Sequence, residues 1–192
     1  MTDAPRIPPL PPEEWSAEIK PILEAVPGGV ERRLGDNNIF PTLARNPELF
    51  RAWLRFGGYL LTAGKLPGRD RELVILRIAV LCRSPYEWGQ HVQISLQGGI
   101  DRETIDRVAQ GPDADGWTSH EAALLRTADE LCEKARISDE TWATLAETYD
   151  EAQLIEVAML AGHYQMLAGM LNSLGVELDD GLEGLPPEAS GP

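Results

Sequence analysis

The sequence contains few cysteines, few lysines and no long run of apolar residues. Cys82 and Cys132 are the only two cysteines, and they stand 50 positions apart. We expect both to be reduced, buried thiols rather than parts of a disulfide framework. No stretch approaches the ~20 consecutive apolar residues of a membrane-spanning helix, and no apolar segment follows a basic N-terminus. These absences predict a cytoplasmic protein that does not insert into a membrane.

Positive charge is also scarce. The chain has 17 lysines and arginines against 31 aspartates and glutamates, which gives a net charge of −14. Nucleic acids and anionic membranes are bound through clustered cations, so neither is expected as a partner. Nearly all of the basic residues are arginines, whose fork suits carboxylate recognition. A biased genome composition explains the same preference more simply.

The chain of 192 residues has the length of one ordinary domain. Both ends are rich in proline, glycine and acidic residues and show no apolar periodicity. We therefore expect flexible tails over residues 1–12 and 181–192. Residues 13–180 are predicted to form a single helical domain.

Apolar periodicity and capping residues predict an all-α fold of about seven or eight helices, with no strand. The segment RELVILRIAVLCR, within residues 70–83, is apolar almost all round and is typical of a buried central helix. A loop is expected over residues 36–41. The other helices are expected over residues 12–25 (ended by 27–29), 47–61 and 84–97, and from Asp101, Thr118, Ser138 and Asp150 onward.

The helix over residues 84–97 contains the residues that suggest chemistry. Ser84-Pro85-Tyr86-Glu87 predicts a capping box with proline at the first helical position. Glu87 and His91 are four residues apart, so their side chains project from one face of the helix. A carboxylate beside an imidazole fixes the tautomer that acid–base chemistry requires. Purely structural roles remain open, with Glu87 as a cap and His91 as a packed core residue.

Three blocks around this pair resemble a known family. They are Arg71-Glu72-Leu73-x-Ile75-Leu76-Arg77-x-Ala79, Tyr86-Glu87-Trp88-x-x-His91 and Gly98-Gly99-Ile100. The family is that of carboxymuconolactone decarboxylase, whose superfamily includes alkylhydroperoxidase D-like proteins, and the resemblance extends from about residue 37 to 178. It implies an all-helical alkylhydroperoxidase D-like bundle, and an obligate homotrimer or homohexamer with its site near a subunit interface.

The resemblance also shows that both cysteine positions of the peroxidase branch hold other residues in this chain. In the peroxidase branch a Cys-x-x-Cys pair ends four residues before the histidine, and a glutamate lies twelve residues before the first cysteine. The matching positions here are Glu72, Ser84 and Glu87, ahead of His91. Serine and glutamate form neither a thiolate nor a disulfide, and Cys82 lies two residues out of register. The dithiol cycle of that branch is therefore excluded.

The implied activity is that of a cofactor-free lyase or isomerase acting on a small carboxylic acid or lactone. His91 would be the acid–base group, and Glu72 or Glu87 would orient it. The decarboxylase branch keeps a glutamate four residues before the histidine, which matches Glu87. Those enzymes are shorter than this chain, which adds about two helices between residues 113 and 150 and an N-terminal extension.

The substrate-binding candidates surround this pair in the sequence. Tyr86 offers a phenol donor and Trp88 an apolar wall. Arg71, like Arg77 and Arg83, could bind a substrate carboxylate or simply neutralise an acid. The segment Gly162-His163-Tyr164 is part of the resemblance, and His163 could supply a second imidazole or pack at an interface. His120 is expected at the surface.

No metal or other cofactor is expected. The three histidines are not at close helical spacing, and no His-Glu-x-x-His pattern or glycine-rich phosphate loop occurs. A site made of Glu87, His91 and His163 is conceivable on composition alone.

Two other functions remain open. One is a non-catalytic oligomeric binding or scaffold protein, and the other is peroxidase-type antioxidant activity through Cys82 or Cys132. The second would require an exposed cysteine with a lowered pKa.

Overall fold

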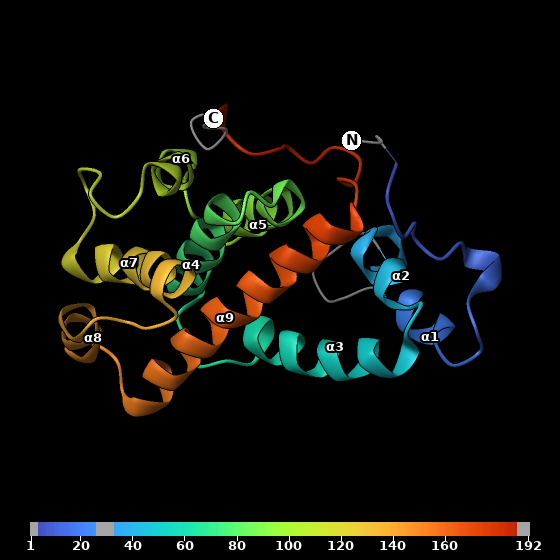
Figure 1. The fold of residues 1–192 in the computed structure, drawn as a ribbon, viewed down its shortest axis with the longest axis horizontal. Coiled ribbons are helices and arrows are strands. Elements are labelled where there is room, and N and C mark those ends of the chain that lie inside the picture. Colours follow the sequence, from blue (N-terminus) through green and yellow to red (C-terminus); the bar gives the residue numbers. More distant parts are fainter. Residues whose placement is uncertain (1–3, 26–32, 188–192) are drawn as a thin grey trace.

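The computed structural model describes residues 4–25 and 33–187, and over these residues it is all-helical, as predicted (Figure 1). The elements, in chain order, are η1 (Pro12–Glu14), α1 (Lys20–Leu23), η2 (Leu34–Asp36), α2 (Ile39–Leu43), α3 (Pro47–Thr62), α4 (Gly68–Leu81), α5 (Pro85–Gln97), α6 (Arg102–Gln110), α7 (Ser119–Lys134), α8 (Asp139–Ala146) and α9 (Glu151–Leu174), where η denotes a 3₁₀ helix.

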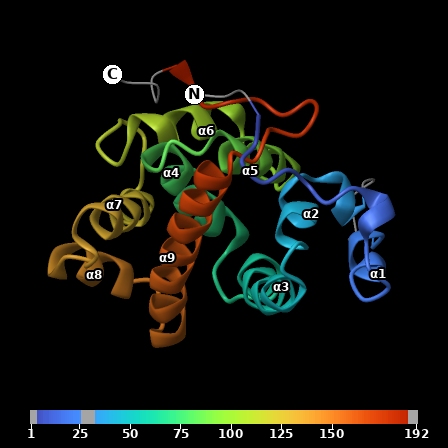
Figure 2. The ribbon, with the colours of Figure 1, turned by 45° about the vertical axis from the view of Figure 1, so that its right-hand side comes forward.

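Helix α4 forms the centre of the bundle. Its buried residues are Glu72, Leu73, Val74, Ile75, Leu76, Ile78, Ala79 and Val80. They point in all directions around the helix, which explains why its sequence is apolar almost all round. Helices α5, α7 and α9 pack around it, and α9 crosses the middle of the molecule in both views (Figures 1 and 2).

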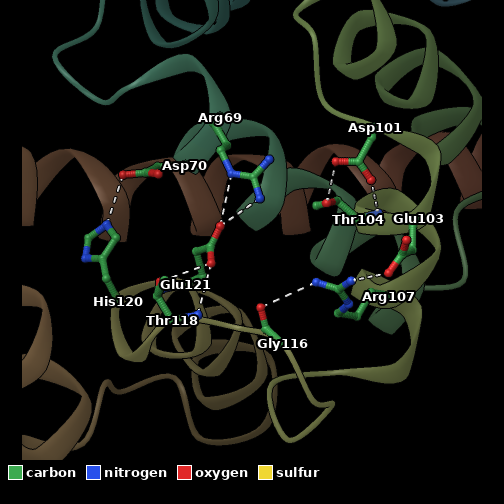
Figure 3. A network of polar contacts seen from close by, with 10 residues as sticks. All are labelled: Arg69, Asp70, Asp101, Glu103, Thr104, Arg107, Gly116, Thr118, His120 and Glu121. Atoms are coloured by element: carbon green, nitrogen blue, oxygen red, sulfur yellow. Dashed lines mark hydrogen bonds and ion pairs between the residues drawn. The ribbon is translucent and has the colours of Figure 1, made fainter.

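Helices α4 and α7 lie side by side and run in the same direction. Arg69 binds Glu121 at 2.8 Å, Asp70 binds His120 at 2.9 Å, and Arg77 binds Asp129 at 2.6 Å. Figure 3 shows the first two of these contacts. The paired residues are 52, 50 and 52 positions apart, so the register between the two helices stays constant along their length. Arg77 thus neutralises an acid.

Most of the predicted helix starts are confirmed. Thr118 with Glu121 and Asp150 with Gln153 form capping boxes at the starts of α7 and α9. Asp101 accepts a hydrogen bond from the backbone nitrogen of Thr104, and Ser138 caps α8 in the same way. Two described helices, α7 and α8, lie between residues 113 and 150.

Two predictions near the N-terminus were wrong. Residues 12–25 form η1 and the single turn α1 rather than one helix. Pro21 would fall in the middle of such a helix, where it lacks a donor and its ring clashes with a preceding carbonyl. The expected loop at 36–41 contains the start of α2, in whose first turn Pro41 is tolerated. The predicted helix end at 27–29 lies outside the described residues.

The predicted capping box at Ser84 was also wrong. Arg83 adopts a left-handed conformation (φ 50°), and the backbone nitrogen of Ser84 donates to the Ala79 carbonyl at 2.9 Å. The nitrogen of Arg83 donates to Val80, so α4 ends in a Schellman motif. The Ser84 nitrogen that a capping box would use is therefore occupied, and Glu87 is not a cap.

Both terminal segments contact the bundle where they are described. The backbone nitrogen of Arg6 donates to the Leu174 carbonyl at 2.8 Å, and Arg45 donates to the Pro8 carbonyl at 2.8 Å. Arg102 binds Glu183 at 2.7 Å. The flexible-tail expectation stays a prediction, and its outermost residues, 1–3 and 188–192, lie outside the described part.

Among the described helices, α9 alone has the length and composition of a membrane span. Of its most apolar window, 56% is buried inside the protein. Its apolar character is therefore accounted for by its place in the core of the bundle.

Candidate active site

The core of the site is a buried pair formed by Glu72 on α4 and His91 on α5. The Schellman turn sends α5 back along α4, so these residues meet although they are 19 positions apart. Glu72 Oε2 lies 2.7 Å from His91 Nδ1, and the two residues are 2% and 6% exposed. The acid that holds His91 is therefore Glu72 rather than Glu87.

The charge state of Glu72 is fixed by its two partners. Arg71 Nε donates to Oε1 at 2.9 Å, while His91 occupies Oε2. Burial raises the pKa of Glu72, but the charges and hydrogen bonds of His91 and Arg71 outweigh it and lower this pKa overall. An ionised carboxylate only accepts hydrogen bonds, so Nδ1 of His91 must be the donor.

This pairing decides which nitrogen of His91 is available for chemistry. In the neutral ring, a proton on Nδ1 leaves the lone pair on Nε2. Within residues 4–25 and 33–187, Nε2 of His91 has no hydrogen-bond partner. The geometry therefore produces an oriented imidazole with a free basic nitrogen.

Glu87 provides a second acid of opposite character. It is 2% exposed, and its Oε2 atom has no hydrogen-bond partner in the described part of the chain. Burial, and secondly the nearby Cys82 thiol, raise the pKa of Glu87 well above its ordinary value. The pKa of one carboxyl group is thus lowered and that of the other raised, an arrangement typical of acid–base sites.

Tyr164 on α9 completes the cluster. Its ring meets the imidazoles of His91 and His163 edge-on, at centroid distances of 5.1 and 5.2 Å. Burial, and then the charges of Glu87 and Glu72, raise its pKa well above the ordinary value. In the sequence, Tyr164 could be recognised only as an apolar-face residue of the last helix and as part of the segment Gly162-His163-Tyr164.

His163 lies beside this cluster in an aromatic environment. Its ring stacks on Trp53 at 6.2 Å and meets Phe56 edge-on at 5.1 Å. Burial lowers the pKa of His163 to about 4, so its imidazole is neutral at physiological pH. It contacts Tyr164 rather than His91.

Tyr86 and Trp88, the other two candidates on α5, are built into the packing. The Tyr86 hydroxyl donates to Asp179 at 2.8 Å and accepts from the backbone nitrogen of Ile39 at 3.2 Å. It thereby fastens the C-terminal segment and α2 to α5. Trp88 is completely buried in the core.

His120 is half-buried rather than at the surface. Asp70 accepts from both its Nε2 atom, at 2.9 Å, and the Tyr149 hydroxyl, at 2.7 Å. Figure 3 shows His120 and Asp70 facing each other across the α4–α7 contact. This second acid–histidine pair therefore joins the two helices.

One surface hollow is lined by Asn38 and Asp179 and another by Arg102 and Glu183, and His91 lines neither of them. In the described ranges, no three histidine, cysteine or acidic side chains gather as metal ligands, and this includes Glu87, His91 and His163.

Helical bundles of the same architecture occur among solved structures. An alkylhydroperoxidase AhpD core, described as an uncharacterized peroxidase-related protein from Ralstonia eutropha JMP134, is 20% identical with a TM-score of 0.77, covering 91% of this chain and 93% of that one. The debrominase Bmp8, solved as a variant in complex with 2,3,4-tribromopyrrole, is 15% identical with a TM-score of 0.71, covering 91% of both chains. A peroxidase-related protein from Silicibacter sp. TM1040 is 15% identical with a TM-score of 0.67, covering 73% and 75%.

These likenesses show that the chain has an alkylhydroperoxidase D-like helical fold. The model of the carboxymuconolactone decarboxylase family matches residues 47–130, which include Glu72, Glu87 and His91. Over this segment the chain is similar to the carboxymuconolactone decarboxylase family. No curated protein sequence matches it significantly.

Proposed function

We propose that this chain is a cytoplasmic, cofactor-free acid–base enzyme, a lyase or isomerase acting on a small carboxylic acid or lactone. The observation that carries the proposal is the contact between Glu72 and His91 Nδ1, 2.7 Å long and buried. A histidine with a purely structural role requires only a hydrogen-bond partner. His91 has an ionised carboxylate, that of Glu72, on Nδ1, and its Nε2 atom is left available for a substrate.

The geometry supports proton transfer at Nε2 of His91. Nε2 takes a proton from the substrate, and the Glu72 carboxylate stabilises the imidazolium that forms. In a decarboxylation the same nitrogen returns a proton to the carbon that has lost CO2. Burial raises the pKa of Glu87, and in its neutral form Glu87 would donate a hydrogen bond to developing negative charge, as a neutral acid does in an oxyanion site.

The test is turnover of carboxymuconolactone and related lactone acids by the wild type and by His91→Ala. We expect CO2 release or solvent-deuterium incorporation in the wild type, and a loss of about 10²–10⁴-fold in the variant. His120→Ala is the matched control, because it also removes a histidine paired with an acid but leaves Glu72 and His91 in place. Equal activity in His91→Ala and the wild type would rule out this mechanism.

A non-catalytic scaffold is the second candidate, and the burial of the pair favours it. Glu72 is 2% exposed and His91 6%, so a single chain presents the pair as part of its core. If no lactone or carboxylic acid is turned over and none protects the wild type from unfolding, the scaffold function is supported.

We further propose self-association as a homotrimer or homohexamer. Ile155, Met159 and Met166 on α9 are 64%, 50% and 57% exposed, and Leu49 on α3 is 57% exposed. Exposed apolar residues spaced along a helix are typical of a face that a second subunit covers. Side chains from such a subunit would complete a pocket next to His91.

Met159→Asp combined with Met166→Asp is expected to convert the oligomer to monomers, because it places charges in the covered face. Light scattering after size-exclusion chromatography measures the mass, and circular dichroism checks the helix content. Trp142→Asp is the matched control, since Trp142 on α8 is 43% exposed but lies outside this face. A monomeric wild type at micromolar concentration would contradict the proposal.

A further inference from the structure

The buried face of α5 carries polar atoms for which the described chain offers no partner. Within residues 4–25 and 33–187, seven buried side-chain oxygen or nitrogen atoms make no hydrogen bond. Four of them belong to α5 and its N-cap residue, namely Ser84 Oγ, Glu87 Oε2, Trp88 Nε1 and Ser95 Oγ. Proteins pair nearly all such groups with protein, water or a ligand. Their concentration on one helix therefore indicates that something binds along this face.

Two of these atoms lie at the N-terminal end of the 13-residue helix α5. Ser84 is the N-cap residue, but its hydroxyl makes no capping hydrogen bond. In the described part of the chain, the backbone nitrogens of Tyr86 and Glu87 have no partner either. Ser84 is completely buried and Glu87 is 2% exposed. The positive end of the helix dipole is thus buried beside two unpaired polar side chains.

The groups at this helix start are suited to an anion. Backbone N–H groups and a serine hydroxyl donate to carboxylate oxygens, and the dipole favours negative charge. Burial raises the pKa of Glu87, and in its neutral form this residue does not repel an anion. Arg71, which the sequence suggested for a substrate carboxylate, binds Glu72 instead. The helix start is therefore the better candidate for that role.

We propose that the N-terminus of α5, with the Ser84 hydroxyl and the first-turn N–H groups, binds a carboxylate of the substrate and anchors it on the His91 face. This inference rests on the acid–base function proposed above and adds a group that the substrate must carry. Ser84 and His91 are seven residues apart, which is about 10 Å along a helix axis. The anchored carboxylate is therefore not the reacting group. The substrate is an acid whose carboxylate lies several bonds away from the carbon at Nε2.

The test is binding of acetate, a minimal carboxylate, to the full-length protein at pH 7, measured by NMR titration of its methyl signal. Acetamide has the same shape without the charge, and we expect it to bind at least ~10-fold more weakly. Ser84→Ala should weaken acetate binding about 10-fold, as the loss of a hydrogen bond to a charged group requires.

Ser95→Ala is the matched control and should leave acetate binding unchanged. Ser95 is as buried as Ser84 and its hydroxyl is also unpaired, but it lies in the last turn of α5, where the dipole disfavours an anion. Ser84→Ala should melt at the wild-type temperature without ligand, because it loses no hydrogen bond of the described chain. Glu87→Gln cannot ionise and should bind acetate at least as tightly as the wild type.

Four outcomes would overturn the proposal: no acetate binding, equal binding of acetate and acetamide, equal losses in the Ser84 and Ser95 variants, or loss of binding in Glu87→Gln. The comparison of acetate with acetamide uses the wild type and does not depend on how any variant folds. Turnover that needs His91 but not Ser84 would remove this subsite and leave the proposed function. Acetate binding that depends on Ser84, without turnover of any acid or lactone, would do the reverse.

Discussion

Glu72→Ala is expected to lower the free energy of unfolding by about 3 kcal/mol, because it leaves two polar partners without their acceptor. Removing one member of a buried ion pair costs about 3–5 kcal/mol. The lower end applies here, since the Arg71 side chain is 19% exposed and can turn toward water. Urea denaturation of the two proteins at pH 7 measures the difference.

A double-mutant cycle isolates the Glu72–His91 contact from the loss of packing. Glu72→Leu with His91→Leu removes both partners, so the double variant should be more stable than the sum of the single effects allows. Additive effects would show that the contact contributes nothing to stability. Glu72→Gln keeps the shape and an acceptor oxygen, and it should cost less than Glu72→Ala.

The pH dependence of stability provides an independent check on Glu72. Its folded-state pKa is lowered, so the unfolded chain binds more protons at acid pH. The stabilising contribution is complete above pH 4.5, the ordinary value, and is lost as pH falls through the folded-state pKa. The free energy of unfolding of Glu72→Ala should therefore fall less steeply than that of the wild type as pH decreases below 4.5.

The sequence predicted the helical class and most helix starts because those signals are local. Thr118 with Glu121 and Asp150 with Gln153 reach partners three residues away, and the helices form as their caps indicate. The same local reasoning failed at Ser84, because the end of α4 takes the backbone nitrogen that the cap would use. That nitrogen bonds to Ala79, in the preceding helix.

The sequence suggested the residues of the candidate site, but it did not predict which acid contacts His91. Spacing along one helix suggested Glu87 for His91, and the family resemblance added Glu72. The choice between them depends on how α5 folds back on α4, which brings Glu72 to 2.7 Å of the imidazole. Arg77 and Asp129 illustrate the same limit, since their contact depends on the parallel register of α4 and α7.

Glu87→Gln is expected to stabilise the protein increasingly as pH rises. The pKa of Glu87 is raised in the folded state, so between pH 4.5 and that raised value the folded chain binds more protons than the unfolded chain. Wild-type stability therefore falls with rising pH by up to about 1.4 kcal/mol per unit from this residue. Glutamine, which has no proton to lose, abolishes that slope.

Urea denaturation at a series of pH values from 5 to 8 distinguishes this expectation from the capping interpretation. A capping glutamate would make Glu87→Gln mildly destabilising by a similar amount at every pH, because a surface cap keeps its ordinary titration. Glu133→Gln removes the same charge from α7, where the Glu133 side chain is 72% exposed, and should leave the profile unchanged. The proposed role of Glu87 as a neutral hydrogen-bond donor depends on the same raised pKa, so a stability difference that does not change with pH would contradict both the stability effect and that role.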